Sequence, residues 1–68
     1  MDRVYVESSN IRTIGYAAGT LEIEFSTGGI YQYAGVPASV HVELMQSNSI
    51  GSYFHQYIKN IYPYSQIA

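Results

Sequence analysis

The TLEIEF segment at residues 20–25 places the strongest constraint on the fold, because its apolar and charged residues alternate strictly. A period of two puts Leu21, Ile23 and Phe25 on one face of an extended strand, and the two glutamates on the other. A strand with one apolar face is typical of an antiparallel sheet that is packed on one side and solvated on the other. We therefore expect residues 20–26 to lie inside such a sheet.

Two further segments, IRTIGY at residues 11–16 and IYQYA at residues 30–34, predict strands on either side of this one. The first is joined to residues 20–26 by Ala-Ala-Gly, in which Gly19 can adopt a positive φ. The second follows a Ser-Thr-Gly-Gly turn and stops at a Gly-Val-Pro sequence. These segments predict a three-stranded antiparallel meander.

The second half of the chain has helical spacing. Pro37 suits the first turn of a helix over residues 38–46, with Val40, Leu44 and either Val42 or Met45 pointing inward. After a QSNS break, Ser49 can cap a second helix that runs to about Asn60. Its apolar residues recur every three or four positions: Ile50, Tyr53, Phe54, Tyr57, Ile58 and Ile61. We predict one α+β domain over residues 1–68, core about 8–64, with both helices packed on one face of the sheet.

The direction in which Tyr31 and Tyr33 point depends on the length of the turn before them. A loop with an odd number of residues, containing a glycine bulge at Gly28 or Gly29, places both tyrosines beside the apolar residues of the preceding strand. A two-residue Gly-Gly turn places them beside the glutamates on the outer face instead. Binary patterning favours the first arrangement, which collects the apolar side chains on one face, while an exposed stacking platform remains the alternative.

Charge and composition limit the function classes. The chain has three basic and five acidic residues, a net charge of −2, and no cysteine. Three cations are too few to grip a long nucleic acid in one copy, and no spacing of His, Cys or acidic residues indicates a metal site. No nucleophile elbow or paired-acid motif indicates catalysis, and we expect neither an enzyme nor a cofactor. Without a signal-like or membrane-length apolar segment, a cytoplasmic location is expected, in the host cytoplasm if the protein is viral.

Polar residues gather in two short segments. The first places Ser8, Ser9, Asn10 and Arg12 at the entry to a strand, where hydroxyls, an amide and a guanidinium suit a phosphate and a base edge. The alternative is a polar entry turn, with Asn10 bonded to local backbone and Arg12 paired with a glutamate across the sheet. The second segment places Ser52, His55, Gln56 and Lys59 on one face of the second helix, with Ser49 at the N-terminus of that helix, where backbone N–H groups favour an anion. Its alternative is a solvated face with a capping serine.

The order of several short motifs resembles that of the KTSC domain. These are SSNI at 8–11, IGY at 14–16, TLEIEF at 20–25, GGIYQY at 28–33, GVP at 35–37, SIGSYF at 49–54 and YPY at 62–64. The family is named after the C-terminus of some lysyl-tRNA synthetases, and the resemblance implies RNA binding. Family members often carry basic residues inside the YxY motif and in the second helix, where this chain has Gln32, His55, Gln56 and Asn60, leaving only Lys59.

We therefore expect a non-catalytic protein that binds a small nucleotide or short oligonucleotide, with RNA binding or protein interaction as an accessory module as the alternative. Tyr31, Tyr33 and Tyr53 join the two polar segments as candidate ligand contacts, because tyrosine rings stack on bases. With 47% apolar and 12% charged residues, a homo-oligomer is expected. A phage protein of this kind would sequester a cyclic nucleotide signal and so evade host immunity.

Overall fold

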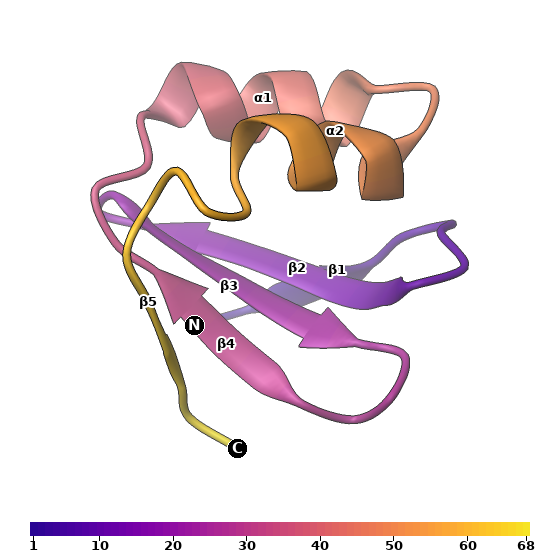
Figure 1. Cartoon of the computed structure of the whole chain (residues 1–68), viewed down its shortest axis with the longest axis horizontal. Helices are drawn as coiled ribbons and strands as arrows, with labels where there is room; N and C mark the ends of the chain where they lie inside the picture. The colour runs from indigo at the N-terminus through magenta and orange to yellow at the C-terminus, as the bar shows by residue number, and fades with distance from the viewer.

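Five antiparallel strands lie in chain order across one sheet in the computed structural model, which describes residues 1–68. They are β1 (Arg3–Tyr5), β2 (Ile11–Ala17), β3 (Thr20–Phe25), β4 (Ile30–Tyr33) and β5 (Tyr64–Gln66). Two helices, α1 (Ala38–Gln46) and α2 (Ile50–Tyr57), lie together over one face of the sheet (Figure 1). This arrangement confirms the predicted α+β class and the placement of both helices on one face.

The predicted three-stranded meander corresponds to β2, β3 and β4, but the sheet has one further strand at each edge. β1 pairs with β2, with Arg3 opposite Gly15, and β5 pairs with β4, with Tyr64 opposite Tyr33. The prediction of three strands was thus incomplete. Each edge strand has only three residues, too few for an alternating pattern to be visible in the sequence.

The register of β4 determines which face of the sheet Tyr31 and Tyr33 occupy. Tyr33 lies opposite Leu21 and Tyr31 opposite Ile23, so both side chains share the helix-covered face with the apolar residues of β3. The connecting loop has three residues, 26–28, because the Phe25 N–H donates to the Gly29 carbonyl at 2.9 Å. Gly28 has a φ of +107°, a conformation that favours glycine. The odd loop length predicted from binary patterning is confirmed.

A β-bulge at Arg12 lets Ile11 and Ile14 both face the core, although they are three positions apart and would point to opposite faces of a regular strand. Ile11 pairs with Phe25 and Thr13 with Glu24, so Arg12 is an extra residue with no partner on β3. The bulge reverses the alternation, and Ile11 and Ile14 both become buried against the helices. Arg12 is left exposed and pairs with no glutamate. The interpretation of Arg12 as a cross-sheet partner was wrong, because the bulge removes it from the ladder.

Nine apolar residues form the core between the sheet and the helices: Ile11, Ile14, Leu21, Ile23, Tyr33, Val36, Leu44, Phe54 and Ile58. In α1, Val40 and Met45 are partly buried against this core, while Val42 is exposed. Met45, and not Val42, is therefore the further inward-facing residue of this helix.

The second helix begins where it was predicted but ends earlier. Ser49 occupies the N-cap position, but its side chain makes no capping hydrogen bond. α2 ends at Tyr57 and not near Asn60, because the N–H groups of Ile58 and Lys59 both donate to the Phe54 carbonyl and the chain then unwinds. Asn60, with a φ of +66°, turns the chain toward β5.

The face of the sheet without helices carries a connected polar network. Arg3 forms an ion pair with Glu22, and its Nε donates to Thr13 Oγ1 at 3.0 Å. Gln32 Nε2 donates to the second oxygen of Glu22 at 2.8 Å. Glu22 is only 5% exposed, yet the bond from Gln32 and the neighbouring Arg3 hold its pKa below the ordinary value despite the opposing effect of burial. The network fastens β1 to the centre of the sheet.

We expect Glu22→Gln to lower the free energy of unfolding at pH 7 by about 1–3 kcal/mol, because Arg3 loses its charged partner. The pKa of Glu22 is lower in the folded chain than the ordinary value of 4.5, so ionised Glu22 stabilises the fold fully above that pH. This stabilisation is lost as the pH falls through the folded-state pKa. Urea unfolding at pH 7 and pH 3 should show the variant approaching the wild type at pH 3; an equal gap at both pH values contradicts this role.

Candidate functional site

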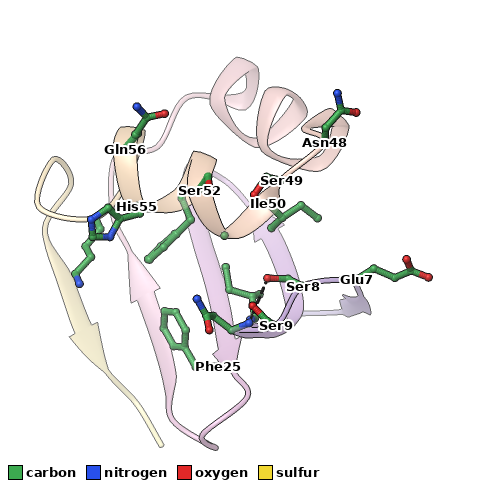
Figure 2. Close-up of a pocket in the computed structure, with 15 residues that line it drawn as sticks. Glu7, Ser8, Ser9, Phe25, Asn48, Ser49, Ile50, Ser52, His55 and Gln56 are labelled. Carbon is green, nitrogen blue, oxygen red and sulfur yellow. Dashed lines mark hydrogen bonds between the residues drawn. The ribbon is translucent and has the colours of Figure 1, made fainter.

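A groove of about 750 Å³ opens between α2 and the loop that joins β1 to β2 (Figure 2). One wall is formed by residues 7–11, the other by side chains between positions 48 and 59, and Phe25 lies between them. The two polar segments singled out in the sequence therefore meet at one place, although they lie far apart in the chain.

The loop wall is shaped by its own hydrogen bonds. The Ser8 hydroxyl accepts hydrogen bonds from the backbone N–H groups of Asn10 and Ile11, each at 3.4 Å. The Asn10 carbonyl accepts a bond from the Ser26 N–H at 2.8 Å, which ties the loop to the end of β3. The side chain of Ser8, and not that of Asn10 as the polar-turn interpretation had it, thus bonds the local backbone. The amide group of Asn10 remains available to a ligand.

The helix wall begins at a second serine turn. Ser47 Oγ accepts a hydrogen bond from the Ser49 N–H at 3.1 Å and donates one to the Ser49 carbonyl at 3.0 Å, which sets the start of α2. The next residue but one, Gly51, faces the loop, since a Cβ built there would lie 3.4 Å from Ser8 Oγ. The two walls are therefore within van der Waals contact of each other at this position.

The floor of the groove is apolar. It is formed by Ile11, Phe25, Ile50 and Phe54. The rings of Phe25 and Phe54 meet edge to face, with centroids 5.5 Å apart. Hydroxyl and amide groups above an aromatic floor suit a planar ring that carries polar substituents.

Three titratable side chains of the groove have no partner within the protein. Glu7 lies at one end of the groove and His55 at the opposite end, with Lys59 in the turn that follows α2 (Figure 2). The only ion pair of the chain, Arg3–Glu22, lies outside the groove lining. No side-chain hydrogen bond within the protein involves Glu7, His55 or Lys59, so these groups are free to contact a ligand.

Seven of the residues predicted as ligand contacts line the groove: Ser8, Ser9, Asn10, Ser49, Ser52, His55 and Lys59. Arg12 does not, because the bulge displaces it from the strand entry. Tyr53 does not either, since its hydroxyl donates to Glu43 Oε1 on α1 at 2.9 Å. Burial and this bond raise the pKa of Tyr53 to about 12. Its role is to join the two helices.

Tyr31 and Tyr33 also lie outside the groove lining. Tyr33 is 4% exposed and its ring packs edge to face on Phe54, with centroids 5.3 Å apart. Burial, with the neighbouring Tyr64 and Tyr31, raises the pKa of Tyr33 to about 12. Tyr31 is partly buried and touches Phe25 edge on, at 5.4 Å. Both tyrosines therefore support the groove floor from behind.

Sequence reasoning did not place Glu7, Asn48 or Phe25 in the groove, although all three line it. Glu7 and Asn48 adjoin the two predicted segments and could have been included as polar loop neighbours. Phe25 shares the apolar face of its strand with Ile23, so an alternating pattern predicts a core residue at this position. It is only partly buried, at the last position of β3.

A model of the KTSC domain matches residues 7–62, a range that contains both walls of the groove. The chain belongs to the KTSC domain family. A solved KTSC domain protein from Yersinia pestis superposes with a TM-score of 0.95 at 39% identity, covering 98% of this chain and 97% of that one. The family resemblance found in the sequence motifs is confirmed.

Two kinds of KTSC relative differ in length. An uncharacterized protein from Stutzerimonas stutzeri strain A1501 is 41% identical over 61 residues, which cover 87% of this chain and 86% of that protein. A lysine–tRNA ligase from Nostoc sp. strain PCC 7120 is also 41% identical, over 91% of this chain, but the chain spans only 11% of the ligase. The KTSC domain is thus a small part of the much longer ligase.

Two structural findings bear on other kinds of site. No group of three or more His, Asp or Glu side chains is placed to hold a metal ion. Neither helix has the length and apolar character needed to cross a membrane.

Proposed function

We propose that this KTSC protein binds a small nucleotide or short oligonucleotide in the groove, without catalysing a reaction. The observation that carries the proposal is the meeting of the two polar segments, residues 7–11 and 48–59, above the rings of Phe25 and Phe54. A planar base can contact the aromatic floor, while hydroxyls, amides and Lys59 contact the sugar and phosphate.

The dimensions and chemistry of the groove support a compact ligand. Its volume of about 750 Å³ falls within the range typical of small-molecule sites. Stacking of one base on an aromatic side chain is worth on the order of 1–3 kcal/mol. Lys59 is the only lysine or arginine in the lining, which suits one or two phosphates better than a long polyanion.

The arrangement of side chains supports binding over catalysis. A nucleophilic serine would need a base within hydrogen-bonding reach, which a third group holds in place. No hydrogen bond joins any serine of the groove to His55, and Glu7 lies at the other end of the groove (Figure 2). The groove is also open to solvent on one side, so it does not exclude water.

We expect Lys59→Gln to weaken nucleotide binding by roughly tenfold, because a phosphate loses its charged contact. Arg12→Gln is the matched control, since it also removes one positive charge but lies outside the groove. Isothermal titration of ribonucleoside monophosphates and cyclic dinucleotides against both variants measures the effect. Equal losses in the two variants would show that only net charge matters, and the absence of heat with every nucleotide would reject the proposal.

Binding without turnover would make the protein a stoichiometric store or sink for its ligand, including a cyclic dinucleotide signal. We further propose a homo-oligomer, because large apolar side chains such as Val42, Tyr57 and Ile61 are about half exposed on or just after the helices. Light scattering coupled to size-exclusion chromatography measures the mass in solution. A monomer at high concentration rejects this part of the proposal and leaves the groove proposal intact.

RNA binding is the second candidate, and the similarity to a segment of lysine–tRNA ligase favours it. A long strand would contact several cations, so its affinity would fall steeply as salt rises. A small ligand held by Lys59 alone should lose little affinity over the same range. Titrations at 50 and 300 mM salt with a short RNA and with a mononucleotide therefore separate the two candidates.

A further inference from the structure

Five aromatic rings form a closed cluster that begins at the groove floor. Phe25 contacts Tyr31 at 5.4 Å between centroids, and Tyr31 contacts Tyr64 at 5.8 Å. The return path runs from Tyr64 to Tyr33 at 5.6 Å and from Tyr33 to Phe54 at 5.3 Å. Since Phe54 and Phe25 also touch, the cluster joins the groove to a residue of the last strand.

Tyr64 is the exposed member of this cluster. The pairing of β5 with β4 puts Tyr64 opposite Tyr33, so the ring lies on the same sheet face as the groove floor. It remains 60% exposed, whereas Tyr33 beneath it is 4% exposed. Gly29 makes room for the neighbouring ring, since a Cβ built there would lie 3.1 Å from Tyr31 Cε1. A second aromatic surface is therefore connected to the groove floor through Tyr31 and Tyr33.

We infer that the exposed ring of Tyr64 is a second stacking subsite, which takes the second base of a ligand whose first base lies in the groove. This inference rests on the proposed function. The ligand class that fits both places is a dinucleotide or the end of a short single strand, because two planar rings joined by a phosphate can contact Phe25 and Tyr64 on either side of Tyr31.

Polar groups of the groove suit the phosphate of such a ligand. His55 lies on α2 at the end of the groove opposite Glu7 (Figure 2), and Lys59 lines the groove from the turn that follows α2. Lys59, with His55 as a hydrogen-bond donor, would meet the phosphate that links the two bases. Tyr64 itself adds no charge, so its contribution should change little with salt.

The test compares mononucleotides with the matching 5′-phosphorylated dinucleotides by isothermal titration, using the four ribonucleotide bases. We expect the dinucleotide to bind the wild type roughly tenfold more tightly, the gain typical of one added base-stacking contact. Tyr64→Leu should remove this gain and leave mononucleotide affinity unchanged. Leucine keeps Tyr33 covered, and Tyr64→Phe, which keeps the ring, should retain the full gain.

Tyr5→Leu is the matched control, because Tyr5 is 83% exposed on the edge strand β1 and belongs to none of the aromatic pairs. The inference is overturned if dinucleotides bind no more tightly than mononucleotides, or if Tyr64→Leu and Tyr5→Leu behave alike. In either case mononucleotide binding still supports the proposed function. If no mononucleotide or dinucleotide binds at all, the proposed function fails and the subsite fails with it.

Discussion

Phe54→Ala is expected to lower the free energy of unfolding by about 3–5 kcal/mol, a loss typical of removing a buried aromatic ring. Phe54 is 5% exposed and contacts the rings of both Phe25 and Tyr33. A domain of 68 residues without disulfides is expected to have an unfolding free energy of only a few kcal/mol, about the size of this loss. The variant should therefore be largely unfolded at 37 °C, which circular dichroism and urea titration can measure.

Ile67→Ala is the control for Phe54→Ala. Ile67 lies just beyond β5 and is 50% exposed, so its truncation should change the unfolding free energy by less than about 0.5 kcal/mol. If Phe54→Ala melts within a few degrees of the wild type, the ring does not hold the helix on the sheet. Phe54 would then not be a fixed part of the groove floor either, although it lines the groove.

The second large effect concerns binding. Ser52→Glu should weaken nucleotide affinity by at least about a hundredfold, because it places a negative charge and added bulk in the groove wall where the phosphate is expected. Ser52 is exposed on α2 and its side chain makes no hydrogen bond, so the fold should be unaffected. Isothermal titration measures the affinity, and a melting curve verifies the fold.

Ser39→Glu provides the matched control, since Ser39 is an exposed serine of α1 that lies outside the groove. It makes the same change in net charge and should leave affinity almost unchanged. A loss of affinity in this variant equal to that in Ser52→Glu would mean that the effect arises from overall repulsion. Unchanged binding in both variants would place the ligand elsewhere on the protein.

The central sheet and the side of the tyrosines were predictable from periodicity. The turn before β4 allowed two loop lengths, and binary patterning favoured the odd one, which places Tyr31 and Tyr33 on the inner face as observed. The edge strands were not predictable, since β1 and β5 are each set by pairing with a neighbouring strand and not by a local pattern. Tertiary contact decides such short strands.

The candidate site was partly predictable for a related reason. Serine, asparagine and lysine residues could be grouped by spacing along each segment, but their meeting at one groove depends on the packing of α2 against the sheet. Arg12 shows what spacing alone does not predict. It follows Asn10 and Ile11 in sequence, but the bulge at Arg12 removes it from the site. The same bulge lets Ile11 and Ile14 both be buried. Bulges of this kind are hard to infer from alternation alone.

The most direct test of the groove proposal is a ¹⁵N–¹H NMR titration of the wild-type protein with a nucleotide that binds in calorimetry. We predict that the largest amide shifts occur in residues 8–11 and 49–55, the two walls of the groove. Amides on the opposite face, at Arg3, Glu22 and Gln32, should not move. Shifts confined to that opposite face, or no shifts at millimolar nucleotide, would contradict the proposal that this groove is a nucleotide site.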